Sequence, residues 1–206
     1  MTSKRFPQVF TVFRKNYKLV PLEVFGKDPY KTLISTLLSS RTKDFVTLNA
    51  SKKLFKIAPN IKKLSQLSQL EIRNLIYPVG FYKTKAKQLK ILPEKIIIDF
   101  EGKIPTDRKN LMSLPGVGRK TANLVLNRAF GKPAIAVDTH VHRITNLLGW
   151  VKTNTPEQTE KELERVLPKK YWRNINRLFV SIGQQYTSKK KLIDFFEKNG
   201  LLKKPQ

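Results

Sequence analysis

The sequence predicts an all-α protein. Apolar residues recur at spacings of three and four along most of the chain, which is the period of a helix with one buried face. Several of these stretches begin with a helix-capping residue, in two cases followed by proline. Apart from the short stretch Ala134 to Val137, no segment alternates with the period of two that a sheet requires. We therefore expect about ten helices and no sheet.

The first half of the chain contains four helical patterns. Asp28 and Pro29 read as a cap and a first helical residue, and an apolar stripe from Tyr30 to Leu38 follows them. The next three helices are expected over Lys43 to Ile57, Ser68 to Tyr77 and Tyr82 to Phe100. Pro59 and Pro78 lie just beyond the first two of these patterns, where proline typically stops a helix.

Capping residues and glycines punctuate the second half in the same way. Thr106 is expected to cap a short helix that ends near Ser113, and Asp138 opens a later helix for which Gly149 is the stop. Further helices are expected from Arg119 to Phe130, from Thr155 and Pro156 onward, and from Tyr171 to Tyr186. A glycine-containing hairpin, Leu114 to Gly118, precedes the Arg119 helix.

The charge balance predicts a nucleic-acid partner. The chain has 41 Lys and Arg against 15 Asp and Glu, a formal charge of +26, and a pI near 10.3. An excess of this size is typical of proteins that bind DNA or RNA, because it attracts a polyanion. A basic face that is merely solvated is the alternative, but it would impose strong self-repulsion on a chain of 206 residues.

The sequence excludes several classes of site. Cysteine is absent, which rules out disulfides, thiolate catalysis and cysteine-ligated zinc or iron-sulfur centres. His140 and His142 are the only histidines, and two residues apart on a helix they face different sides, so we expect no metal site. Met1 to Val12 has no apolar signal core and no segment is long enough to span a bilayer. We expect a soluble monomer in the cytoplasm, associated with the nucleoid.

The hairpin Leu114-Pro115-Gly116-Val117-Gly118 is the first chemically informative motif. Gly116 and Gly118 can expose their backbone amides, and the helix that follows points its unpaired N–H groups and positive dipole end at the same place. A phosphate could be held there without any side chain. The alternative is a turn that simply needs glycine, and its carbonyls could also hold a monovalent cation.

Lys120 and Asp138 add the elements of a reaction. An ammonium at the start of a helix opposes the helix dipole and lies among other cations, which favours the neutral amine and so a nucleophile. Lys120 could instead only contact phosphate. Asp138 reads as an N-cap, yet a carboxylate fixed beside the apolar stretch Ala134 to Val137 could also stabilise positive charge in a transition state.

These motifs resemble the endonuclease III branch of the helix-hairpin-helix DNA glycosylases. The similarity extends from about Pro29 to Gln185. Lys120 and Asp138 both fall at the family's catalytic positions. The segments that carry the resemblance are Leu37 to Ser40, Thr42 to Asp44, Val79 to Tyr82, Lys85 and Ala86, Leu114 to Ala122, Ala129 to Pro133, Ile135 to Val141, and Arg143.

The resemblance implies two helical domains on either side of a DNA cleft. One domain spans 26–135 and carries the helix-hairpin-helix motif; the other combines 1–25 with 136–206. It also implies a base-excision repair enzyme that removes oxidised pyrimidines and nicks abasic sites in double-stranded DNA. The target nucleotide must be flipped out of the duplex. The amine of Lys120 would then attack C1′ and form an imine, and Asp138 would stabilise the cationic sugar.

Further positions take roles from the same resemblance. Arg41 and Phe81 fall at the positions that fill the gap left by a flipped base, although family members often carry glutamine where this chain has Arg41. Phe81 could instead be a core aromatic. The expected DNA contacts are Leu114, Gly116, Val117, Gly118 and Arg119 in the hairpin, and Thr139, His140, Lys189, Lys190 and Lys191 along the backbone.

The chain departs from the family at its C-terminus. Family members commonly hold an iron-sulfur cluster on four cysteines, and counted from Gly183 these positions fall here on Tyr186, Ile193, Phe196 and Leu202. We expect no cluster. Instead, a stripe of Trp172, Ile175, Phe179, Ile182 and Tyr186 should continue into a small core with Ile193, Phe196 and Leu202.

Two other functions remain open on the sequence. A monofunctional thymine or uracil mismatch glycosylase would share the scaffold, but those enzymes commonly lack a lysine at the position of Lys120. A DNA-binding protein without catalysis would keep only the hairpin. Borohydride trapping on abasic DNA separates these alternatives, because only a lysine imine gives a covalent adduct.

Overall fold

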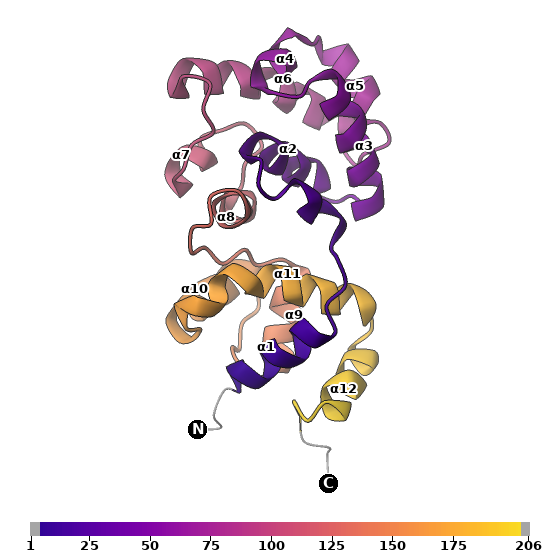
Figure 1. Cartoon of the computed structure of the whole chain (residues 1–206), viewed down its shortest axis with the longest axis vertical. Helices are drawn as coiled ribbons and strands as arrows, with labels where there is room; N and C mark the ends of the chain where they lie inside the picture. Colours follow the sequence, from indigo (N-terminus) through magenta and orange to yellow (C-terminus); the bar gives the residue numbers. More distant parts are fainter. Residues whose placement is uncertain (1–4, 203–206) are drawn as a thin grey trace. The chain divides into compact units, whose positions relative to one another are not determined.

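The computed structural model describes residues 5–202, which form twelve α-helices and one 3-10 helix and contain no strand (Figure 1). The all-α prediction is thus confirmed, with two more helices than expected. The elements are α1 (Phe6–Lys15), η1 (Pro21–Phe25), α2 (Pro29–Ser39), α3 (Asp44–Ile57), α4 (Ile61–Gln66), α5 (Gln69–Ile76), α6 (Tyr82–Phe100), α7 (Arg108–Met112), α8 (Arg119–Arg128), α9 (Thr139–Leu147), α10 (Pro156–Val166), α11 (Lys169–Gln185) and α12 (Lys189–Lys198).

The chain forms two compact units. The middle unit is Pro21–Lys132, and the terminal unit combines Met1–Val20 with Pro133–Gln206, of which 1–4 and 203–206 lie outside the described residues. The sequence places the domain boundaries a few residues later, at 25/26 and 135/136, and those boundaries stay a prediction. The hairpin and Lys120 belong to the middle unit, whereas Asp138 belongs to the terminal unit.

Helix α2 is the centre of the middle unit. Every residue from Thr32 to Leu38 is buried, so α2 has no solvent face over two turns, and it packs against α3, α6 and α8. Asp28 caps it as expected, because its carboxylate accepts the backbone N–H of Lys31 at 3.0 Å. Burial on all sides therefore fixes α2 within the middle unit.

An aromatic core holds the terminal unit together. Phe10 and Phe13 from α1 and Phe179 from α11 are fully or almost fully buried, and Trp150 lies 5.4 Å from Phe179 between ring centroids. Side chains from α9, α10 and α12 complete the same core. This apolar cluster orders a unit whose two segments are far apart in the sequence.

The structure corrects the start of one helix and adds two others. Asp107, not Thr106, caps α7, because its carboxylate accepts the backbone N–H of Asn110 at 2.9 Å. The helices α4 and α12 are capped by Asn60 and Ser188, whose side chains accept N–H groups of the first turn. Both are good N-cap residues, so the signal was present in the sequence. No helix within residues 5–202 combines the length and apolarity needed to cross a membrane.

Candidate functional site

The glycine hairpin between α7 and α8 is a tight turn anchored in the core of the middle unit. The backbone N–H of Val117 donates to the carbonyl of Leu114 at 3.1 Å, and Gly116 has a φ of +76°. Pro115 and Gly116 thus occupy the two central positions of a turn that needs a positive φ at the second. Leu114 and Val117 are buried, while Gly116 and Gly118 are exposed. The turn therefore presents its backbone to solvent.

The two glycines serve different purposes. At Gly116 a Cβ atom would lie 2.6 Å from the side-chain oxygen of Gln88, and the positive φ would strain any larger residue. Gly118 has ordinary extended angles, with φ of −88° and ψ of 174°, and a Cβ there would meet nothing within 4 Å. The fold accepts a side chain at position 118. Glycine there instead leaves the backbone N–H groups at the start of α8 open to close approach.

Lys120 is exposed on the first turn of α8, directly after the hairpin. Gly118 has no side chain, so the N-cap position of α8 makes no side-chain hydrogen bond to the first turn. The ammonium of Lys120 makes no hydrogen bond or ion pair with another residue of 5–202. An exposed amine thus lies next to the N-terminal end of α8.

Asp138 caps α9 in the terminal unit and is half-buried. One of its carboxylate oxygens, Oδ1, accepts the backbone N–H of Val141 at 2.8 Å. Its other oxygen accepts no hydrogen bond within the described part of the chain. The buried stretch Ala134 to Val137 leads into it, as the sequence suggested. The cap therefore fixes the carboxylate and leaves one oxygen for another partner.

The remaining residues expected at a DNA backbone all belong to the terminal unit. Thr139 is exposed at the start of α9, and Lys189, Lys190 and Lys191 are exposed on the first turn of α12. His140 is half-buried against Gly183 of α11, where a Cβ would lie 2.3 Å from the imidazole Nδ1. His140 therefore has a packing role between α9 and α11 in addition to any contact with DNA.

Arg41 and Phe81 lie together on the surface of the middle unit. The guanidinium carbon of Arg41 lies 5.2 Å from the ring centroid of Phe81, and both residues are exposed. Phe81 is 59% exposed, which argues against the alternative of a core aromatic. Both residues also have a positive φ, 51° and 57°, a region that non-glycine residues seldom adopt. Two strained residues from separate loops are thus held in one place.

Lys85, on the first turn of α6, is a buried ammonium that the sequence did not single out as a site residue. It is 7% exposed, and its Nζ donates to the carbonyls of Leu38 and Ser40 at 2.8 and 2.6 Å and to the hydroxyl of Thr42 at 3.3 Å. Burial lowers the pKa of Lys85 to about 8. The periodicity of α6 could have indicated that Lys85 is buried, because Lys85 occupies the buried face beside Ala86 and Leu89.

The C-terminal segment packs on the terminal unit through aromatic side chains. Tyr186 stacks on Phe195 with ring centroids 4.4 Å apart, and Phe196 is fully buried. The sequence was wrong about Ile193, which is only partly buried; Leu192 and Phe195 enter the core in its place. None of the four positions of the cluster cysteines bears a thiol, so the residues present do not fit an iron-sulfur cluster.

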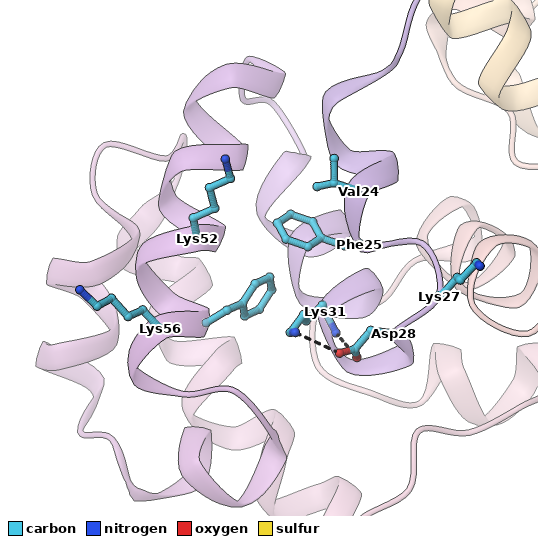
Figure 2. A pocket seen from close by; sticks show the side chains of 8 residues that line it. Val24, Phe25, Lys27, Asp28, Lys31, Lys52 and Lys56 are labelled. Carbon is cyan, nitrogen blue, oxygen red and sulfur yellow. Dashed lines mark hydrogen bonds and ion pairs between the residues drawn. The ribbon is translucent and has the colours of Figure 1, made fainter.

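The middle unit also contains a lysine-rimmed pocket of about 610 Å³ beside η1 and α3 (Figure 2). Phe25 and Phe55 form its apolar floor, and Lys31 pairs with Asp28 at 3.4 Å. Neither this pocket nor a second one of about 620 Å³ beside Tyr30 is lined by Arg41, Phe81, Lys120 or a hairpin residue. Arg41, Phe81, Lys120 and the hairpin therefore lie elsewhere on the middle unit.

Comparison with known proteins gives one consistent match. Residues 34–169 match the family model of the HhH-GPD superfamily base excision DNA repair proteins. The chain is 46% identical to endonuclease III of Thermotoga maritima over 172 residues, which cover 84% of this chain and 81% of that protein. It is 44% identical to endonuclease III-like protein 1 of Mus musculus over 159 residues, 76% of this chain but 53% of that longer protein.

The fold matches as well. A trapped endonuclease III–DNA covalent intermediate, an estranged-adenine complex, superimposes with a TM-score of 0.77 at 30% identity. The match covers 91% of this chain and 89% of that one. The similarity therefore includes both units of the chain.

Proposed function

Because the chain belongs to the endonuclease III family, within the HhH-GPD superfamily of base excision repair proteins, and is thus a DNA glycosylase and AP lyase, we propose that Lys120 and Asp138 carry both reactions. The bases removed are oxidised pyrimidines, in double-stranded DNA. Bare abasic sites are nicked by the same lysine. The observation that carries the proposal is the unpaired amine of Lys120 directly behind an exposed backbone turn.

The glycosylase step forms a bond from Lys120 Nζ to C1′ of the flipped nucleotide while the bond from C1′ to the base breaks. The base leaves with a proton, the sugar ring opens, and an imine links the lysine to the sugar. Removal of a C2′ proton then expels the 3′ phosphate and cuts the strand. Water hydrolyses the imine and returns the free lysine.

Asp138 stabilises the positive charge that develops on the sugar as the base departs. Its free oxygen is the part of the carboxylate that can face the cation, because Oδ1 is engaged by Val141. A fixed negative charge needs no reorganisation at the moment of reaction, which is the main source of electrostatic catalysis. The same oxygen can accept a proton from the attacking amine.

The hairpin holds the DNA backbone. The open N–H groups at the start of α8 bind a phosphate, aided by the positive end of the helix dipole. Leu114, Val117 and Arg119 flank those donors, and the carbonyls of the turn can bind a monovalent cation. Thr139, His140 and the lysines 189–191 supply further backbone contacts from the terminal unit.

We propose that the enzyme works without an iron-sulfur cluster. Tyr186, Phe195, Phe196 and Leu192 replace the metal with an apolar core, and the side chain of Arg143 donates to the carbonyls of Gly183 and Tyr186 at 3.2 Å. We also propose that it acts as a monomer in the cytoplasm, with the nucleoid. Stoichiometric iron or sulfide in the purified protein would contradict the proposal that the enzyme works without a cluster.

Borohydride trapping tests the function. A duplex with one abasic site is incubated with the enzyme and sodium borohydride, and the wild type should give a covalent adduct that Lys120→Ala does not. Lys109→Ala is the matched control, because it removes another exposed lysine of the same unit. Release of a thymine or uracil opposite guanine without any adduct would instead indicate a monofunctional mismatch glycosylase. Binding without base release or nicking would leave only a DNA-binding role.

A further inference from the structure

Arg41 and Phe81 come from two different loops that touch one another directly. The backbone N–H of Gly80 donates to the hydroxyl of Thr42 at 3.0 Å. A Cβ atom at Gly80 would lie 2.4 Å from the carbonyl oxygen of Arg41, so only glycine allows the loops this close. The contact between the guanidinium of Arg41 and the ring of Phe81 depends on this approach.

Arg41 and Phe81 are held in a strained backbone conformation. Each residue has a positive φ, and a non-glycine residue in that region is strained by about 1 kcal/mol or more. Both side chains point into solvent, so burial does not compensate for the strain. Interactions elsewhere in the two loops must therefore determine their conformation.

Lys85 provides those interactions. Its buried ammonium joins α6, which begins directly after Phe81, to the end of α2 and the residues around Arg41. Hydrogen bonds from a charged donor are stronger than those between neutral groups, and three acceptors here share one ammonium. Leu38 and Ser40 also lie where the last carbonyls of α2 carry the negative end of the helix dipole.

We propose that Lys85 is the positioning residue that holds Arg41 and Phe81 as one preassembled wedge. The proposal rests on the proposed function and on the expectation from the sequence that these two side chains fill the space left by a flipped nucleotide. A wedge that is already formed inserts without first ordering two loops. Lys85 itself contacts no DNA, because its ammonium is buried and fully used inside the unit.

Two variants disturb this arrangement by different routes. Lys85→Met keeps most of the length of the side chain but removes all three hydrogen bonds. Gly80→Ala keeps Lys85 and pushes the two loops apart, because the added methyl group meets the carbonyl of Arg41. Lys90→Met is the matched control: Lys90 is also on α6, and its ammonium donates to the carbonyl of Ser65 at 2.9 Å, away from both loops.

The test compares two substrates, each measured as the ratio of variant to wild-type rate. One is a duplex with an oxidised pyrimidine, where the wedge must replace a base in the stack. The other is single-stranded DNA with an abasic site, where there is no stack to fill. We expect the rate of Lys85→Met and of Gly80→Ala to fall about 10- to 100-fold on the duplex and at most about twofold on the single strand. The rate of Lys90→Met should equal that of the wild type on both substrates.

The outcomes are distinct. Equal loss on both substrates would overturn the proposal, since it would indicate general damage to the enzyme. No loss on the duplex would overturn it as well, because Lys85 would then be only structural. Fluorescence of 2-aminopurine placed opposite the lesion reports insertion of the wedge directly. In Lys85→Met and Gly80→Ala this fluorescence should be lower than in the wild type, in parallel with the rate on the duplex. If the wild type itself gave no borohydride adduct on a duplex with an abasic site, the proposed function would fail independently.

Discussion

Asp138 holds the start of α9 through a single hydrogen bond, from the backbone N–H of Val141 to Oδ1 at 2.8 Å. Because this bond needs only one side-chain oxygen, the cap and the negative charge of Asp138 can be tested separately. Asp138→Asn keeps the cap, because asparagine is as good an N-cap as aspartate. We expect the free energy of unfolding to stay within about 0.5 kcal/mol of wild type and base release to fall about 100-fold or more, because the negative charge is lost.

Asp138→Ala removes both roles and provides the comparison. It should lower the free energy of unfolding by about 1 kcal/mol, the usual cost of losing a cap, and reduce base release as much as Asp138→Asn does. Denaturant unfolding and single-turnover excision measure the two effects. Full activity in Asp138→Asn would remove this carboxylate from the reaction and leave it as a cap alone.

The two hairpin glycines predict opposite effects of the same substitution. Gly116→Ala places a methyl group against Gln88 at a positive φ, so we expect lower thermal stability and weaker DNA binding together. Gly118→Ala has open space and ordinary backbone angles in the free protein. It should keep the melting temperature and still weaken binding to duplex DNA, measured by fluorescence anisotropy. Unchanged affinity in Gly118→Ala would show that no phosphate approaches the backbone there.

Lys85 predicts a pH dependence of stability. Its pKa is lowered to about 8, whereas a lysine of the unfolded chain titrates near 10.5. Between these values the unfolded state binds more protons, so the contribution of Lys85 to the free energy of unfolding rises with pH. The hydrogen bonds to Leu38 and Ser40 favour the charged amine, so they oppose the effect of burial on the pKa. They therefore raise the lower limit of the pH range over which the stability increases.

Comparison with Lys85→Met isolates this contribution. The free energy of unfolding of the wild type, minus that of Lys85→Met, should increase by about 2 kcal/mol between pH 7.5 and pH 10. Urea unfolding at several pH values measures it, and the corresponding difference for Lys90→Met should stay flat. A difference that falls with pH over this range would mean that the fold raises the pKa of Lys85.

The sequence predicted local features better than tertiary ones. Caps such as Asp28 and Asp138 and the turn at Gly116 depend on a few adjacent residues, so their residue types were enough. The hydrogen bonds of Lys85 join residues more than 40 positions apart, and nothing near Lys85 in the chain indicates them. Ile193 was misplaced for a related reason: it lies on α12, which Ser188 caps, and the buried face of that helix carries Leu192, Phe195 and Phe196.

The three lysines at the start of α12 predict a change in salt dependence. They are exposed and form no ion pair with the described carboxylates, so neutral substitution should leave the fold intact. Each phosphate contact contributes about −0.9 to the slope of log K against log salt. Replacing Lys189, Lys190 and Lys191 by Gln should make the slope shallower by about 0.9 for each lysine that contacts DNA. An unchanged slope would identify them as a solvated surface.

The C-terminal core predicts that packing replaces metal in ordering the tail. Phe196 is fully buried and lies 6.1 Å from Phe13 between ring centroids, so Phe196→Ala should lower the free energy of unfolding by about 3–5 kcal/mol. Ile193→Ala is the control on the same helix and should cost much less, because Ile193 is only partly buried. An iron chelator should leave the melting temperature of the wild type unchanged, since no thiolate is present to bind iron. If Phe196→Ala unfolded like the wild type, the tail would not depend on this core, and another interaction would have to account for its order.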